Sequence, residues 1–173
     1  INAQQEIELF DLGDIIGVAN ALSNNDVCAV IIECVQGVGG LDESTTSFYK
    51  RLHHLCKKFN VVLIADEVQS GFGRTGDFFA FQKHKIIPDI ISMAKGMGNG
   101  FPIGGILIHP KIKASFGLLG TTFGGNHLAC TASLTVLEVI KKEKLQENAK
   151  IIFDYFKKEA QSLPHLKAIK GRG

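Results

Sequence analysis

The sequence has no tryptophan, only four prolines and four cysteines, and almost no net charge. The cysteines contain no C-x-x-C pair, which argues against a zinc knuckle or a disulfide framework. We expect them to be small buried apolar groups in a reducing, cytoplasmic protein. They are Cys28, Cys34, Cys56 and Cys130.

Charge and hydropathy exclude two classes of partner. With 19 Lys and Arg against 17 Asp and Glu, the net charge is only +2, so the basic surface typical of a nucleic-acid binder is missing. Apolar runs such as residues 27–32 are far shorter than the roughly 20 residues that span a bilayer. We expect neither a nucleic-acid nor a membrane partner.

The two ends of the chain predict a piece of a larger protein. The first residue is Ile1, and no signal-peptide pattern follows it. Gly171, Arg172 and Gly173 are typical of a turn that enters another element. A length of 173 residues fits one globular domain, or one domain with part of a second.

Strand and helix patterns alternate along the chain. Apolar, β-branched runs predict strands at 27–35, 61–65, 89–93 and 103–108, the first of them buried on both faces. Helical spacing of apolar residues predicts helices at 11–22, 45–59, 128–142 and about 145–163. This order predicts an α/β fold with a mostly parallel sheet. Antiparallel pairing of the first two strands would refute it.

Charged residues stand where predicted strands end. Asp66, Glu67 and Lys95 fall at or just after such ends, where open α/β sheets bind ligands. Residues 71–76 place a glycine-rich loop beside Asp66, and residues 121–126 place hydroxyls and bare amides before a helix, an arrangement that suits a phosphate. Solvated charges and a ligand-free helix cap are the alternatives for these positions.

Two other functional classes stay open at this point. Residues 61–67 also resemble the Mg²⁺-binding strand of a P-loop ATPase, although no G-x-x-x-x-G-K-[ST] occurs in the chain. A non-enzymatic α/β binding module is the second alternative. No metal site is predicted, because His53 and His54 cannot share a helix face and the other histidines, His84 among them, are expected on the surface or in loops.

Three blocks of sequence together carry a family resemblance. Residues 63–76 (LIADEVQSGFGRTG), 88–96 (PDIISMAKG) and 100–105 (GFPIGG) resemble the signature of class III pyridoxal-phosphate aminotransferases, most of all the acetylornithine and ornithine aminotransferases. The resemblance extends over about residues 30–149. It implies that residues 1–135 are part of the large, cofactor-binding domain of a type-I pyridoxal-phosphate transferase. Residues 136–173 would be a linking helix and the start of the C-terminal small domain.

The resemblance assigns roles to residues around the cofactor, pyridoxal 5'-phosphate. It implies that Lys95 is the catalytic residue and binds the cofactor covalently. Asp66 would pair with the pyridinium nitrogen, Val68 would pack on the ring, and Gln69 would hydrogen-bond near the ring hydroxyl.

Two further residues follow from the same resemblance. Thr122 would bind the cofactor phosphate of a neighbouring subunit, which implies a homodimer. Glu33 corresponds to a glutamate that we expect to support the site from behind the contacting residues. Other cofactor contacts of the family have no counterpart in this chain, so we expect these 173 residues alone to lack transaminase activity.

The implied reaction is transfer of an ω-amino group from acetylornithine, or a similarly acylated ornithine, to 2-oxoglutarate in arginine biosynthesis. Ornithine, γ-aminobutyrate and diamines are the alternative donors. Cys34 stands where the family commonly has proline, and Val38 where it commonly has a glutamate thought to pair with a substrate-binding arginine. We expect Val38 to leave that arginine free for a substrate α-carboxylate.

Overall fold

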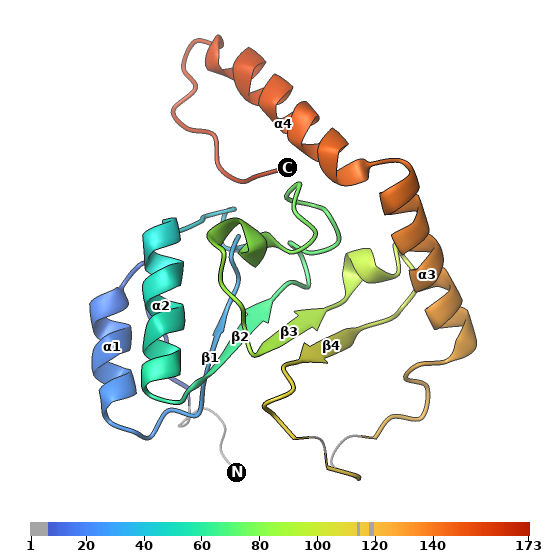
Figure 1. Cartoon of the computed structure of the whole chain (residues 1–173). Helices are drawn as coiled ribbons and strands as arrows, with labels where there is room; N and C mark the ends of the chain where they lie inside the picture. Colours follow the sequence, from blue (N-terminus) through green and yellow to red (C-terminus); the bar gives the residue numbers. More distant parts are fainter. Residues whose placement is uncertain (1–6, 114, 118–119) are drawn as a thin grey trace.

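A computed structural model describes residues 7–113, 115–117 and 120–173. Its sheet has the order β1-β2-β3-β4, in which the first three strands are parallel and β4 is antiparallel to β3 (Figure 1). The predicted α/β fold with a mostly parallel sheet is therefore confirmed. In chain order the elements are α1 (Ile15–Ser23), β1 (Ala29–Ile32), α2 (Thr46–Lys58), β2 (Val62–Asp66), the 3-10 helix η2 (Ala80–His84), β3 (Ile90–Met93), the 3-10 helix η3 (Lys95–Met97), β4 (Gly105–Ile108), α3 (His127–Lys142) and α4 (Leu145–Gln161).

Strand register decides which loops meet. Ala29 pairs with Val62 and Ile32 with Ala65, while Asp66 pairs with Ser92 on β3. The carboxyl ends of β1, β2 and β3 thus lie at one edge of the sheet, which we call the strand-end edge. Because β4 runs the other way, the loop that follows it leaves from the opposite edge (Figure 1).

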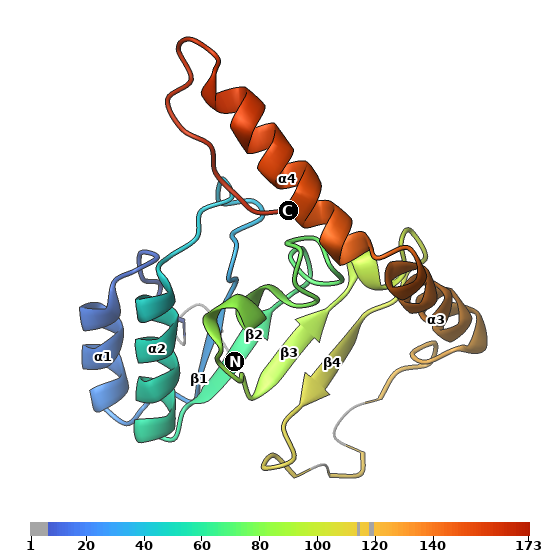
Figure 2. The same cartoon turned by 45° about the horizontal axis from the view of Figure 1, so that its top comes forward.

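The core lies between the sheet and the two N-terminal helices, which stand side by side beside it (Figure 2). Side chains alternate along β2, so Leu63 and Ala65 are buried against α2 while Asp66 belongs to the other face. Both helices start at a side-chain cap: Asp14 accepts a hydrogen bond from Gly17 N, 2.8 Å, and Thr45 accepts one from Phe48 N, 3.2 Å.

The prediction that the first strand is buried on both faces was wrong. β1 covers only Ala29–Ile32, and the Ile31 side chain is 64% exposed. An apolar run is compatible with burial on both faces, but burial requires another element to pack on each face. No described element packs over Ile31. The strand is shorter than the run because its pairing with β2 ends at Ile32.

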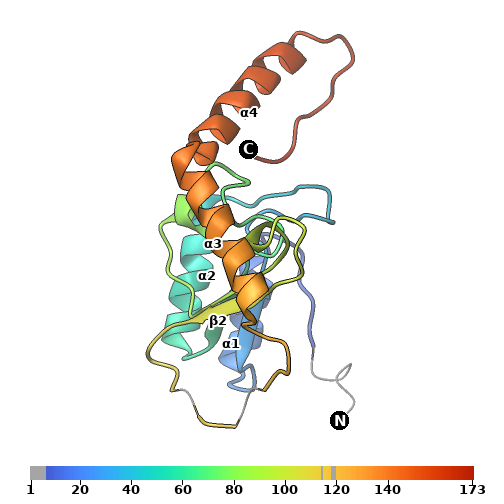
Figure 3. The same cartoon turned by 90° about the vertical axis from the view of Figure 1, so that its right-hand side faces the viewer.

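α3 runs alongside the sheet on the β4 side, and α4 continues from it beyond the sheet, so that the two helices form an arm (Figure 1 and Figure 3). α3 passes without a break through the predicted domain boundary at residues 135 and 136. Apolar residues along both helices are exposed: Leu128, Leu134, Ile151, Ile152, Tyr155 and Phe156. In the described part of the chain no helix combines the length and the apolar character of a membrane span.

Three positions disagree with their predicted environments. His84 is fully buried, although a surface or loop position was expected. Cys28 and Cys130 are exposed, whereas Cys34 and Cys56 are buried as expected. Residue type alone misleads here because the burial of a single side chain depends on which element packs over it.

Candidate functional site

Asp66, the last residue of β2, is held by neighbours on two strands. Its Oδ1 atom accepts hydrogen bonds from the Val68 amide, 3.0 Å, and from the Ser92 hydroxyl, 3.1 Å. Neither bond uses Oδ2, and no other hydrogen bond to this carboxyl comes from the described residues. The carboxylate is thus fixed in orientation with one oxygen available to a donor, as a protonated pyridine nitrogen requires.

Lys95 begins the turn that follows the neighbouring strand β3. Its backbone has φ +43°, a left-handed conformation that is unfavourable for a residue other than glycine. The carbonyl of Lys95 accepts hydrogen bonds from Gly98 N, 3.2 Å, and Asn99 N, 3.2 Å, so the turn holds this conformation. Strain kept in place by hydrogen bonds is characteristic of functional positions. The side chain is exposed and carries a primary amine at the strand-end edge.

Glu33 and Gln69 meet indirectly, through Gly37. Glu33 Oε2 accepts a hydrogen bond from Gly37 N, 2.9 Å, which closes the turn after β1. The Gln69 side chain packs so closely on Gly37 that any Cβ there would collide with its amide. Glu33 therefore closes the turn that confines Gln69, and the supporting role expected for it stays a prediction.

Glu67, the residue after Asp66, is a fully buried acid. Its Oε2 accepts hydrogen bonds from Ser70 Oγ, 2.7 Å, and Ala80 N, 2.9 Å, and its Oε1 accepts one from Phe81 N, 3.0 Å. Burial raises the pKa of this carboxyl, while the Ala80 and Phe81 amides and the Ser70 hydroxyl oppose the rise. Glu67 thereby ties the two ends of the loop that carries Val68 and Gln69.

A shallow hollow of about 460 Å³ places Arg74 near Lys95. The glycine-rich loop after β2 reaches this region, because a Cβ on Gly96 would lie 3.3 Å from Phe72 Cβ. Arg74 and Lys95 line the hollow with the turn of residues 99–103. The loop of residues 71–76, predicted beside Asp66, thus also lies near Lys95, and it contributes a second cation, Arg74, for which the sequence predicts no role.

Thr122 is not brought to the other predicted residues within this chain. It is exposed in the loop between β4 and α3, which leaves from the edge opposite to Lys95 (Figure 1). Nearby Thr121 Oγ1 accepts a hydrogen bond from Gly124 N, 3.1 Å, and Asn126 caps α3 by accepting one from Ala129 N, 3.0 Å. The expected contact with a neighbouring subunit's phosphate stays a prediction.

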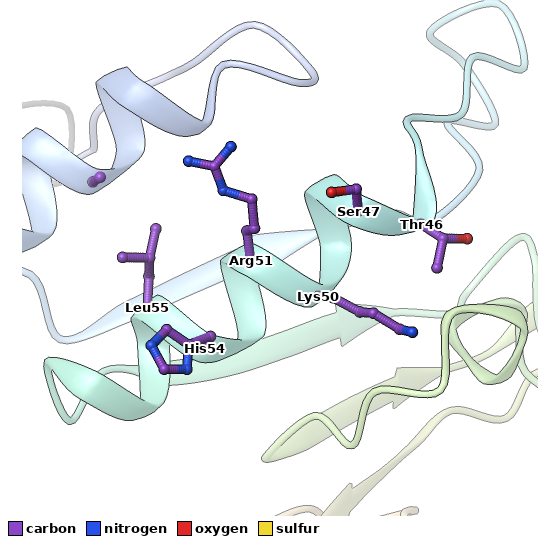
Figure 4. A pocket seen from close by; sticks show the side chains of 7 residues that line it. Thr46, Ser47, Lys50, Arg51, His54 and Leu55 are labelled. Atoms are coloured by element: carbon purple, nitrogen blue, oxygen red, sulfur yellow. The ribbon is translucent and has the colours of Figure 1, made fainter.

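A second hollow, of about 600 Å³, lies between α1 and α2 (Figure 4). Arg51 reaches from α2 toward α1, and the exposed Lys50 and His54 also line it. Thr46, at its rim, is hydrogen-bonded to His84 Nδ1, 3.0 Å. None of the predicted site residues lines this hollow, so it is separate from the strand-end edge.

Sequence reasoning missed Ser92 and Arg172. A signal existed for Ser92, which is the polar residue of the strand Ile-Ile-Ser-Met and falls on the face of Asp66. No sequence signal marked Arg172, because its partners Glu43 and Asp77 are far away in sequence.

The arrangement is thus a fixed carboxylate and an exposed amine at the ends of adjacent parallel strands. This donor set fits pyridoxal phosphate, since Asp66 offers an anion to the ring nitrogen and Lys95 offers an amine to the aldehyde. The fold and these two groups define the class as a cofactor-dependent transferase of the α/β type.

Comparison with known proteins gives the family. The model of the family "Aminotransferase class-III" matches residues 4–173. The acetylornithine aminotransferase of Aquifex aeolicus is 43% identical over 94% of this chain and 43% of its own length. A mitochondrial alanine–glyoxylate aminotransferase 2 homolog of Arabidopsis thaliana is 41% identical over 94% of this chain and 35% of its own.

Comparison with solved structures gives the same family. The ornithine aminotransferase of Toxoplasma gondii, described with pyridoxal phosphate at its active site, superposes with a TM-score of 0.87 at 34% identity, over 96% of this chain and 41% of that one. The chain belongs to the class III aminotransferases, a family that uses pyridoxal phosphate. It spans less than half the length of the relatives it matches.

Proposed function

We propose that the intact protein transfers the ω-amino group of N-acetylornithine, or of a similarly acylated ornithine, to 2-oxoglutarate. The observation that carries the proposal is the placement of Asp66 and Lys95 at the ends of adjacent parallel strands. The choice of donor is supported by the acetylornithine aminotransferases among the relatives. The reaction would belong to arginine biosynthesis, in the cytoplasm.

Each residue has a part in this proposal. Pyridoxal phosphate, when bound, supplies the electron sink for the electrons left on the substrate carbon after its proton is removed. Lys95 would hold the cofactor and then, with its amine free, carry the proton at the substrate carbon that bears the amino group. Asp66 would keep the ring nitrogen protonated. Val68 and Gln69 would orient the ring, with Glu33 behind them.

The proposed active unit is a homodimer in which Thr122 serves the neighbouring subunit's cofactor. Support comes from exposure and direction: residues 121–126 are exposed, and they follow β4, which runs antiparallel to β3. The first 135 residues would be part of the large domain and residues 136–173 the start of the small one.

Ornithine is the second candidate donor, because ornithine aminotransferases are among the structures that superpose on this chain. Val38 bears on the class of donor that both belong to. Its side chain is 89% exposed just beyond the Glu33–Gly37 turn, and it brings no carboxylate to pair with a substrate-binding arginine. An unpaired arginine favours donors with a free α-carboxylate whose reacting amine lies at the other end.

Borohydride reduction of the intact protein, followed by peptide mapping, tests the cofactor assignment. We expect the label on Lys95, and a label on any other lysine would refute it. Turnover with acetylornithine, ornithine, γ-aminobutyrate and a diamine then tests the donor. We expect acetylornithine to have the highest kcat/KM, and Val38→Glu to shift the ratio of kcat/KM values toward unacylated ω-amines. An unchanged ratio would contradict the role of Val38.

A further inference from the structure

Arg172, close to the end of the chain, lies buried between two loops of the strand-end edge. Its side chain is 11% exposed. Its Nε atom lies 3.0 Å from Glu43 Oε2, Nη1 lies 3.4 Å from Asp77 Oδ2, and Nη2 donates a hydrogen bond to the Ala80 carbonyl, 3.1 Å. We call these four residues the Arg172 cluster. It joins the chain after α4 to segments about 90 and 130 positions earlier.

The backbone around Arg172 is shaped for this position. Gly171 and Gly173 have φ angles of +96° and +85°, which favour glycine. A Cβ on Gly171 would lie 3.3 Å from Leu41 Cδ1, and one on Gly173 would overlap the carbonyl oxygen of Arg74. The two glycines thus let the C-terminal segment lie against the loops that contain Leu41 and Arg74. Figure 2 shows this segment returning from the end of α4 toward those loops.

One path from Arg172 leads to Asp66. Ala80 accepts a hydrogen bond from Arg172 through its carbonyl and donates one to Glu67 Oε2 through its amide, 2.9 Å. Glu67 is the residue next to Asp66, and its other hydrogen bonds bind Ser70 and Phe81. Arg172 is therefore linked, through Ala80 and Glu67, to the loop that carries Val68 and Gln69.

A second path leads to Glu33. Glu43 ends the turn that begins after β1, and Gln36 N donates to the carbonyl of Asp42, 2.9 Å, to close it. Without Arg172, the Glu43 carboxylate, 17% exposed, would keep the half-exposed Lys83 as its charged partner, because burial keeps His84 neutral, with a pKa of about 4. A carboxylate left short of partners in a buried place is costly, so the turn would rearrange.

We propose that Arg172 is a positioning residue of the cofactor site: it fastens the turn of residues 33–43 to the loop of residues 67–80, and so holds Glu33, Asp66 and Gln69 in place. The inference rests on the proposed function only in naming what the site binds. The fastening itself follows from the contacts of the Arg172 cluster.

The test compares three variants of the intact protein. Arg172→Ala removes the cluster, and Arg172→Lys keeps a charge but loses the planar fork that spans Glu43, Asp77 and Ala80. Lys170→Ala is the matched control, since it removes an ion pair of the same segment, Lys170 to Asp42, whose side chains are 54% and 46% exposed. Hydrogen exchange of the peptides 33–43 and 67–80 is measured without cofactor. The dissociation constant of added pyridoxal phosphate is measured by its absorbance band.

We expect Arg172→Ala to speed exchange in both peptides and to raise the dissociation constant about tenfold to a hundredfold, by analogy with the loss seen when the hydrogen-bond partners of metal-ligating residues are removed. Free guanidinium should partly restore binding, and Arg172→Lys should fall between. Lys170→Ala should match the wild type. If Arg172→Ala does not fold, Arg172→Lys with the same two readouts decides.

The proposal would be overturned if the two arginine variants exchanged at the wild-type rate in both peptides. It would also be overturned if exchange became faster evenly over the whole chain, or if Lys170→Ala had the same effect as Arg172→Ala. A wild-type protein that binds no pyridoxal phosphate would instead refute the proposed function, while the exchange measurement would still test the fastening.

Discussion

The strand-end edge and the α3–α4 arm differ in how much of their side-chain chemistry is satisfied within this chain. At the strand-end edge, the buried Glu67 accepts three hydrogen bonds, and the largely buried Arg172 forms ion pairs with Glu43 and Asp77. On α4, only Ala160 is buried, while Ile151 and Tyr155 are 65% and 63% exposed. The contrast shows that the charged groups behind the strand-end edge find partners among the described residues, whereas the apolar side of the arm has no cover among them.

The largest expected effect concerns the strand-end edge. Asp66→Asn keeps an oxygen that can accept from Val68 and Ser92 but removes the charge. We expect kcat/KM of the intact protein to fall about a thousandfold, because a unit charge at about 4 Å in an effective dielectric of about 20 contributes roughly 4 kcal/mol. Steady-state kinetics measures this. Ser92→Ala, which keeps the charge of Asp66, should lower kcat/KM less. An equal fall in kcat/KM would show that the hydrogen bond to Asp66, rather than its charge, determines the rate.

A pair of apolar truncations compares the two regions directly. Leu63 on β2 is 1% exposed, and Ile152 on α4 is 56% exposed. In urea unfolding of this chain, we expect Leu63→Ala to lower the free energy of unfolding by about 3 kcal/mol because it leaves a cavity. Ile152→Ala should change it by less than about 0.5 kcal/mol. Similar losses would mean that the arm is packed after all, and the contrast would fail.

The smallest effect concerns a titration within the strand-end region. Burial, with Arg172 and Lys83 adding to it, lowers the pKa of His84 from 6.5 to about 4, and Glu43 opposes this. The unfolded chain takes up a proton near pH 6.5 and the folded chain only near 4, so stability is full above pH 6.5 and is lost as the pH falls toward 4. At pH 5 the loss should be about 2 kcal/mol relative to neutral pH.

The measurement is denaturant unfolding at pH 7 and pH 5. His84→Gln should show a smaller drop between the two than the wild type, and the exposed His54→Gln should show the full drop. If the His84 variant lost as much as the wild type, the burial of His84 would not govern the acid sensitivity of the fold.

Prediction from the sequence worked where a pattern is local. The helix at 46–58 differs from the predicted 45–59 by one residue at each end, because its cap Thr45 and its apolar spacing lie close together in sequence. The strand predicted at 27–35 is only Ala29–Ile32, because strand length depends on the partner. The sequence placed Asp66 and Lys95 at or just after predicted strand ends, and the parallel pairing of β2 and β3 brings these two strand ends to one edge.

By itself, the sequence determined the order of strands and helices and the positions of the carboxylate and the amine at strand ends, since both follow from short-range periodicity. Only the tertiary structure decided that Gln69 packs on Gly37, that His84 is buried against Tyr49, and that Arg172 joins Glu43 to Asp77. The physical reason is that these contacts join segments widely separated along the chain. Strand register and helix packing, rather than local propensity, determine which of them meet.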